Sequence, residues 1–176
     1  TFQVFEVPAA VAKSLQPGAM LEFRDEEGFI ELNSRRIDTR TVAGSRLRAL
    51  PGRATPHRLH LVQFTGPVRP EWRAQVLSQG VRVVGYVPQN TYLVYGPESA
   101  VAGLEKAMER APFVQWQGEY RTSDKVHPRV GVAPGNPVVV QLVAEEKLNR
   151  STIDLIRRWA TGITRGAPEM GWLSTM

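Results

Sequence analysis

The sequence predicts an α+β fold in which a four-stranded antiparallel sheet carries two helices on one face. Two observations favour this fold. Between Arg58 and Tyr120, strand-like and helix-like segments follow one another in the order strand, helix, strand, strand, helix, strand. Within these segments, apolar residues recur at the spacing of the expected element. This order is the split βαβ, or ferredoxin-like, arrangement. The six segments are 58–64, 70–79, 81–87, 91–95, 97–110 and 112–120.

The first half of this unit is a strand followed by a helix. In the strand, 58–64, two sets of side chains alternate, as expected for a strand with two distinct faces. Gly66 and Pro67 end the strand. Pro70 suits the first turn of the helix because the N–H there has no helical partner, and Gly80 suits the left-handed position after the helix.

The second half begins with a hairpin and ends with the second helix and the closing strand. Residues 88–90 are expected to form the turn of the hairpin. In the second helix, Val101, Leu104 and Met108 share one face, which predicts that this face covers the sheet. Pro112 ends the helix because proline cannot continue it.

The segments that flank this unit divide the chain into four parts. Residues 1–56 are expected to be a variable leader with a short hairpin, which turns at residues 26–28, and an arginine-rich connector. Residues 57–124 form the sheet domain, and 125–137, rich in proline and glycine, are a linker. Residues 138–176 are expected to form a smaller C-terminal β–α–β subdomain.

Strand and helix patterns recur on a smaller scale in both flanking parts. In the leader hairpin, apolar side chains of one face are expected to dock on the sheet domain: Leu21, Phe23, Ile30 and Leu32. In the subdomain, a valine-rich strand precedes an amphipathic helix and an extended segment: 138–143, 149–160 and 172–176.

The composition, 42% hydrophobic and 22% charged, is that of an ordinary globular protein. The net charge of +5 is spread unevenly: between residues 35 and 58, seven arginines stand against Asp38. Such a basic run can bind nucleic acid. No aromatic residue lies between these arginines, so the stacking part of a single-strand site is missing. We therefore interpret the run as a solvated linker and expect no nucleic-acid partner.

Motifs for catalysis or cofactor binding are missing from the sequence. There is no cysteine, no Gly-x-Ser-x-Gly elbow and no glycine-rich phosphate loop. His57 and His60 are the one candidate metal pair, and no third ligand lies near them in sequence. No apolar run is long enough to span a membrane. We expect no catalytic residue, no cofactor, no metal, no membrane and no small-molecule substrate.

RNA recognition is a distant alternative, because the same strand order occurs in RNA-binding modules. Those modules use paired aromatic side chains on the exposed face of the third strand. Here Tyr92 and Tyr95 are three residues apart, so they are expected to point to opposite faces.

Three sequence blocks resemble the N-terminal propeptides of bacterial subtilisin-like serine proteases. The blocks contain the patterns VQF-GP, YVP-N-YLV and V-W…Y…K, in that order and at similar spacing. They cover roughly residues 57 to 127, and the segment from 138 onward is similar more loosely. The matching residues are 59–67, Trp72, 77–94, 113–116, Tyr120 and Lys125.

This resemblance implies a function in protease maturation. Such propeptides have a ferredoxin-like fold, bind surface helices of the protease through an exposed sheet face, and help the catalytic domain to fold before inhibiting it. The implied partner is a subtilisin-like catalytic domain, bound in cis or in trans, and the implied location is secreted or periplasmic. A free-standing inhibitor or interaction module of the same fold is the alternative.

The resemblance further implies that a C-terminal tail lies along the protease cleft. Four residues are candidates for that tail: Leu173, Ser174, Thr175 and Met176. Subtilisin-like clefts favour a large apolar residue at the cleaved position and another three residues earlier, which Met176 and Leu173 match. Alternatively, Met176 is only the last residue of this sequence, and the segment that enters the cleft lies beyond it.

Overall fold

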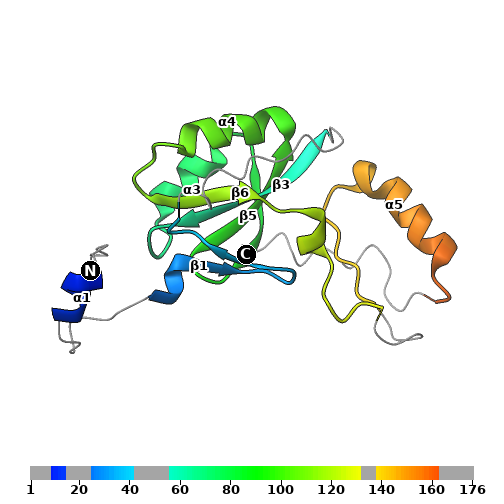
Figure 1. Ribbon diagram of the computed structural model, residues 1–176. Helices are drawn as coiled ribbons and strands as arrows, with labels where there is room; N and C mark the ends of the chain where they lie inside the picture. The colour runs from blue at the N-terminus through cyan, green and yellow to red at the C-terminus, as the bar shows by residue number, and fades with distance from the viewer. Residues whose placement is uncertain (1–8, 15–24, 42–55, 132–137, 163–176) are drawn as a thin grey trace. The chain divides into compact units, whose positions relative to one another are not determined.

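The computed structural model describes residues 9–14, 25–41, 56–131 and 138–162, and the chain divides into two units, Thr1–Arg129 and Val130–Met176. The first unit contains both sheets (Figure 1). Its larger sheet has four strands in the spatial order β4-β5-β3-β6, and every neighbouring pair is antiparallel. These strands are β3 (His57–Phe64), β4 (Arg82–Val87), β5 (Thr91–Pro97) and β6 (Val114–Glu119). The predicted α+β class with an antiparallel sheet is therefore confirmed.

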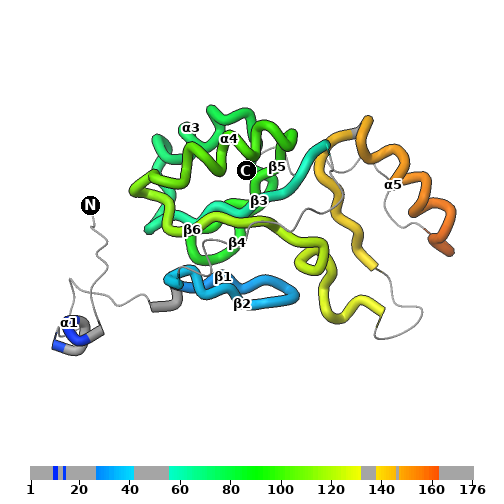
Figure 2. Tube along the Cα trace, turned by 45° about the horizontal axis from the view of Figure 1, so that its top comes forward, coloured from blue at the N-terminus to red at the C-terminus, as the bar shows by residue number. Residues whose placement is uncertain are grey.

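Helices α3 (Pro70–Leu77) and α4 (Glu98–Met108) cover one face of the four-stranded sheet (Figures 1 and 2). The side chains that face them alternate with those of the other face along each strand, as the pleat requires. Burial of this apolar layer is the main stabilising contribution on this side of the sheet. The buried cluster consists of Val62, Phe64, Val76, Val81, Val94, Val101, Leu104, Met108 and Phe113.

The turn between β4 and β5 contains two consecutive residues with left-handed backbone, Gln89 at φ 64° and Asn90 at φ 55°. Hairpin turns favour this conformation because its twist matches that of the strands, but it is costly for a side chain such as that of glutamine. Gln63 compensates by donating a hydrogen bond from its amide Nε2 to the Gln89 carbonyl oxygen, at 3.1 Å. The Tyr86 hydroxyl accepts a hydrogen bond from the Asn90 N–H, at 3.2 Å.

A two-stranded hairpin formed by β1 (Phe29–Glu31) and β2 (Arg36–Asp38) covers the opposite face of the sheet (Figures 1 and 2). Ile30 and Ile37 of the hairpin form a buried cluster with Leu61 and Trp116 of the sheet. Trp116 lies along its own strand above Gly118, where a Cβ atom would come within 2.5 Å of the indole ring. Both faces of the sheet are thus buried at its centre.

The predicted hairpin exists, but its predicted turn at residues 26–28 is wrong. Residues Asp25–Gly28 form the 3-10 helix η1 that leads into β1, and the turn lies at 32–35, where the Leu32 N–H donates to the Arg35 carbonyl at 2.8 Å. The predicted docking of the hairpin on the sheet is confirmed for Ile30 and Leu32. Leu21 and Phe23 lie outside the described residues.

The second unit contains helix α5 (Glu146–Trp159), which matches the helix predicted at 149–160. The strand predicted at 138–143 is not formed. Among the described residues nothing pairs with this segment, and Val138, Val139 and Val140 remain exposed. The extended segment predicted at 172–176 lies outside the described residues. No described helix, including the short α1 (Ala9–Ser14), is long and apolar enough to cross a bilayer.

Asp124, in the 3-10 helix η2 (Thr122–Lys125) that follows β6, anchors the hairpin turn. Its buried carboxylate accepts hydrogen bonds from the Arg35 guanidinium at 3.0 and 3.1 Å, from the Ser34 hydroxyl, and from the Arg121 N–H at 2.8 Å. Arg35 also donates to the Glu119 carbonyl, at 3.2 Å. Residues 34 and 35 are thereby fixed to the end of the sheet. Burial acts to raise the pKa of Asp124, but these hydrogen bonds outweigh it and the pKa is lowered.

We expect Asp124→Ala to lower the free energy of unfolding by about 3 kcal/mol, because it leaves the Arg35 charge and the Ser34 hydroxyl without their acceptor. Urea denaturation measures this loss. Asp38→Ala is the matched control: this exposed carboxylate also pairs with an arginine, Arg40 at 3.1 Å, yet its removal should change the midpoint little. A loss for Asp124→Ala that is as small as the loss for Asp38→Ala would show that the Asp124 anchor is unimportant for stability.

Candidate functional site

The predicted cleft-binding residues Leu173, Ser174, Thr175 and Met176 lie outside the described residues. The contacts of the described residues therefore concern the sheet domain and helix α5. Four features of these parts are candidates for function: a buried histidine cluster, the two faces of the sheet, a pocket beside α3, and the surface of α5.

The histidines of the His57-x-x-His60 pair lie on opposite faces of β3, as their separation of three residues requires. His57 stacks on Tyr95, with ring centroids 5.5 Å apart, on the face that carries the hairpin. His60 is buried on the helical face, where its Nε2 lies 3.4 Å from Gln117 Oε1 and its Nδ1 lies 3.5 Å from Glu105 Oε1. The part of the chain that the structure describes holds no group of three or more potential metal ligands.

The surroundings of His60 keep it neutral. Burial lowers the pKa of His60 to about 4; the nearby Glu105 carboxylate opposes this shift, and the Arg58 charge adds to it. Arg58 forms a bidentate pair with Glu105: its two terminal guanidinium nitrogens donate to the two carboxylate oxygens, at 3.0 and 2.9 Å. The Nε of Arg58 lies 2.7 Å from a carboxylate oxygen of Glu98. The Glu105 carboxylate is therefore already paired with the Arg58 guanidinium, which stays charged at all relevant pH values. This cluster ties β3 to α4 and carries the features of a structural rather than a catalytic arrangement.

In the arginine run between residues 35 and 58, each arginine that the structure describes forms an ion pair with a carboxylate. Arg35 binds Asp124, and Arg58 binds Glu98 and Glu105. The other described members, Arg36 and Arg40, pair with Glu31 and Asp38 and lie over the Phe29 ring. Sequence reasoning missed these pairings because most partners are distant in sequence. Arg46, Arg48 and Arg53 lie outside the described residues.

The sheet face implied by the propeptide resemblance is not fully exposed, because the hairpin β1–β2 covers its centre. Gln63 and Gln115 strengthen this cover: both donate side-chain hydrogen bonds to the Glu27 carbonyl, at 3.0 and 3.1 Å, and Gln115 also donates to the Thr39 hydroxyl. The expectation of an exposed sheet face is therefore wrong at the centre of the sheet.

One end of the same face holds residues that do not belong to the buried cluster beneath the hairpin. There His57, Leu59 and Tyr95 are half-buried, and the Arg82 guanidinium lies 5.2 Å from the centre of the Tyr95 ring. The residues belong to β3, β5 and β4, which are neighbours in the sheet. This cluster, which we call the sheet-end patch, combines apolar, aromatic and cationic groups on a rigid support.

The two tyrosines of β5 point to opposite faces, as predicted. Tyr92 packs edge-to-face on Phe64 in the helical core, at 5.3 Å between ring centroids, whereas Tyr95 belongs to the sheet-end patch. A pair of neighbouring aromatic rings, as in RNA-recognition modules, is not formed on this strand.

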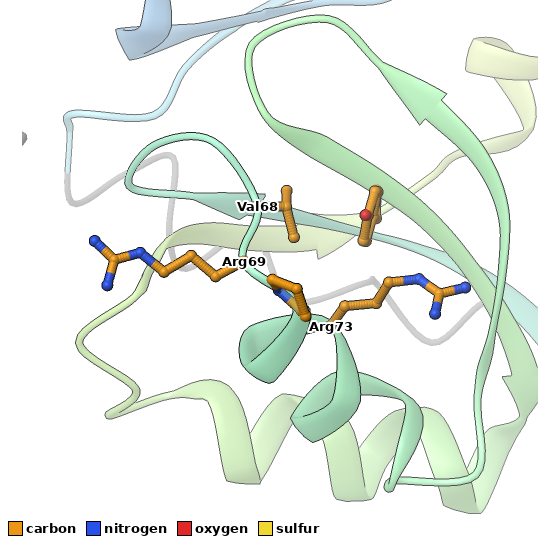
Figure 3. Close-up of a pocket in the computed structure, with 5 residues that line it drawn as sticks. Val68, Arg69 and Arg73 are labelled. Carbon is orange, nitrogen blue, oxygen red and sulfur yellow. The ribbon is translucent and has the colours of Figure 1, made fainter. Parts of the chain in front are cut away.

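A shallow pocket of about 310 Å³ lies beside the first turn of α3 (Figure 3). Its lining consists of Val68, Arg69, Pro70, Arg73 and Tyr92. The side chains of Arg69 and Arg73 extend in opposite directions, away from each other (Figure 3). The Arg69 guanidinium instead lies over Trp72, 5.0 Å from the ring centre. The two charges do not converge, so this pocket lacks the arrangement that an anionic ligand requires.

Exposed apolar side chains are concentrated in the second unit. On α5, Leu148 is 42%, Leu155 53% and Trp159 77% exposed. Ile153 and Ile156, on the adjoining side of the same helix, are half-buried. A surface of this kind is typical of a protein or membrane contact.

The residues that carry the propeptide resemblance have structural roles in the described part of the chain. Gln63 holds the β4–β5 turn, and Trp116 lies in the cluster beneath the hairpin. The Tyr120 hydroxyl donates to the Asp124 carbonyl, at 2.8 Å. These positions therefore specify the fold rather than an exposed contact.

A comparison with protein families matches residues 31–121 to the model described as "Domain of unknown function (DUF8729)". This region begins in the hairpin and ends just after β6, so it contains the sheet, both of its helices and most of the cover. No curated protein and no solved structure matches the chain.

The buried, neutral His60 predicts a loss of stability in acid. Since its pKa is about 4 in the folded chain and about 6.5 when unfolded, the unfolded state binds more protons between these values. Stability is therefore complete above pH 6.5 and declines as the pH falls toward 4. From pH 7.5 to 4.5 this group should contribute a loss of about 2 to 3 kcal/mol.

Urea denaturation across this pH range tests the prediction. His60→Gln should lose less stability on acidification than the unsubstituted chain. His127→Gln, an exchange of an exposed histidine, should follow the unsubstituted profile. Identical pH profiles for His60→Gln and the unsubstituted chain would contradict the assignment.

Proposed function

The chain belongs to the DUF8729 family, and we propose that it is a non-catalytic protease-binding domain: the propeptide of a subtilisin-like serine protease, which assists folding of the catalytic domain and inhibits it. The proposal combines the sequence resemblance with the architecture of residues 57–119. It implies that the chain is secreted or periplasmic. A free-standing inhibitor or interaction module of the same fold, acting in trans, is the alternative.

The order of the strands is the observation that supports this proposal best. We propose that the sheet, in the order β4-β5-β3-β6 with α3 and α4 on one face, is a ferredoxin-like unit. The chain order strand, helix, strand, strand, helix, strand is that expected from the resemblance. Fold alone does not specify function, so the resemblance at 59–67, 77–94 and 113–116 is the second support.

The hairpin changes how such a domain would bind its protease. Because β1 and β2 cover the sheet centre, we propose that the sheet-end patch is the part of the face that contacts the catalytic domain. Its Tyr95 and Arg82 are of the residue types that contribute most to protein interfaces. A tail such as 173–176 would then occupy the cleft as an added strand.

Inhibition by the tail is tested with the purified chain and a subtilisin-like protease acting on a small peptide substrate. We expect suppression of hydrolysis at micromolar chain, with no hydrolysis by the chain itself. Met176→Asp should weaken inhibition at least about tenfold, because it would place a carboxylate in an apolar pocket. Gln141→Asp makes the same charge change at an exposed position and should inhibit normally.

If Met176→Asp, or a chain that ends at Gly171, inhibits as well as the unsubstituted chain, the tail is not the inhibitory segment. If no concentration of the chain inhibits, the proposed function itself is wrong.

Contact through the sheet-end patch is tested by two matched tyrosine substitutions. Tyr95→Ala should weaken inhibition by about tenfold, a typical loss for an aromatic residue at an interface centre. Tyr86→Ala removes an exposed tyrosine of β4 that packs edge-to-face on Tyr92, and should leave inhibition within about threefold. Thermal melting confirms that both variants fold. Equal inhibition constants for both variants would place the contact elsewhere.

A further inference from the structure

Helix α5 carries an apolar seam that nothing covers in the described part of the chain. The seam consists of Leu148, Thr152, Leu155 and Trp159, at intervals of four, three and four residues. This is the spacing of the d and a positions of a coiled coil, with leucine at both d positions. The three apolar members are exposed, and Trp159, at the C-terminal end, is the most exposed of them.

The narrow width of the seam favours a helix as its partner. Helices that lie in a membrane surface present a broad apolar face, whereas a stripe restricted to a and d positions is typical of packing against one other helix. On α5 the neighbouring apolar residues Ile153 and Ile156 are half-buried, so the apolar residues that are mostly exposed lie along one line of the helix.

The charge of α5 indicates what kind of helix would fit. Its described charged side chains are Lys147, Arg150, Arg157, Arg158 and a single carboxylate, Asp154. A carboxylate oxygen of Asp154 lies 3.8 Å from a guanidinium nitrogen of Arg157, so Arg157 offsets part of the negative charge of Asp154. Arg158 directly precedes Trp159 and so lies at a position flanking the seam, where coiled coils place charges that select the partner.

The same charge argues against a second copy of the chain as the partner. The described positions that flank the seam include no carboxylate, so a second α5 helix would offer Arg158 no opposite charge: they are Asn149, Ser151, Ile156 and Arg158. A helix with acidic flanking positions would instead form opposite-charge pairs with Arg158.

We propose that α5 is a docking helix whose seam, Leu148–Thr152–Leu155–Trp159, binds an amphipathic helix of a partner protein that carries Glu or Asp beside its own apolar seam. This surface lies in the second unit and is distinct from both the sheet-end patch and the tail. The inference therefore does not depend on the proposed protease inhibition.

The experiment uses the full chain and two synthetic helical peptides. Both peptides have leucine at their a and d positions; one has glutamate at the flanking e and g positions, and the other has lysine. Isothermal titration calorimetry should show binding of the glutamate peptide, at least about tenfold tighter than that of the lysine peptide. Tryptophan fluorescence should shift to shorter wavelength on binding, and this shift should be lost in Trp159→Phe.

Three variants separate the seam from the rest of the helix. Leu155→Gln should weaken binding of the glutamate peptide at least about tenfold, whereas Arg150→Gln, on the far side of the helix, should stay within about threefold. Arg158→Glu should weaken binding of the glutamate peptide and strengthen that of the lysine peptide. All three positions are exposed, so circular dichroism should show unchanged folding.

Three other results would overturn the proposal. The proposal is wrong if neither peptide binds. Binding to vesicles that contain phosphatidylglycerol, lost in Leu155→Gln and without any peptide binding, would make α5 a membrane helix. A dimer in sedimentation that Leu155→Gln dissociates would make the seam a self-association surface.

Discussion

The central constraint on this molecule is that strand β3 is buried on both faces. Five consecutive residues of β3, His60 to Phe64, are buried, so the sheet needs an apolar cover on each side. Helices α3 and α4 supply one cover, and the hairpin β1–β2 supplies the other. Gln63 lies where these requirements meet, because its one amide group bonds to the Glu27 carbonyl of the hairpin region and to the Gln89 carbonyl of the β4–β5 turn. A polar residue at the centre of the sheet is tolerated because it links these separate segments.

The sheet domain could be predicted from sequence because its signals are local. Alternation along β3, proline at the start of α3 and the apolar stripe of α4 each lie within one element. The hairpin turn was misplaced because the acidic run before Gly28 is typical of a turn, whereas Asn33 and Ser34 form it. Asp124 holds residues 34 and 35 in place. This contact spans 90 residues between Ser34 and Asp124, so no local sequence pattern indicates it.

The same distinction between local and distant contacts explains why one prediction for the second unit is correct and another is wrong. The residues 138–143 are rich in valine and therefore favour a strand, but a strand forms only where another strand accepts its hydrogen bonds, and none is present among the described residues. Helix α5 was predicted correctly because a helix forms its hydrogen bonds internally. Of the candidate sites, the tail falls outside the described residues, and the sheet-end patch could not be found from sequence because it joins three strands.

The bond between Arg35 and Asp124 also determines the order in which the domain can be completed. Its partners are 89 residues apart, so the hairpin leaves the ribosome long before the helix η2 that anchors it. During that interval the sheet residues on which Ile30 and Ile37 pack, Leu61 and Trp116, are still being made. Closing such a long loop is slow compared with forming a hairpin or a helix. Among the described strand pairs, β1–β2 is therefore the first to be synthesised, and its anchor to the end of the sheet can form only once η2 has been made.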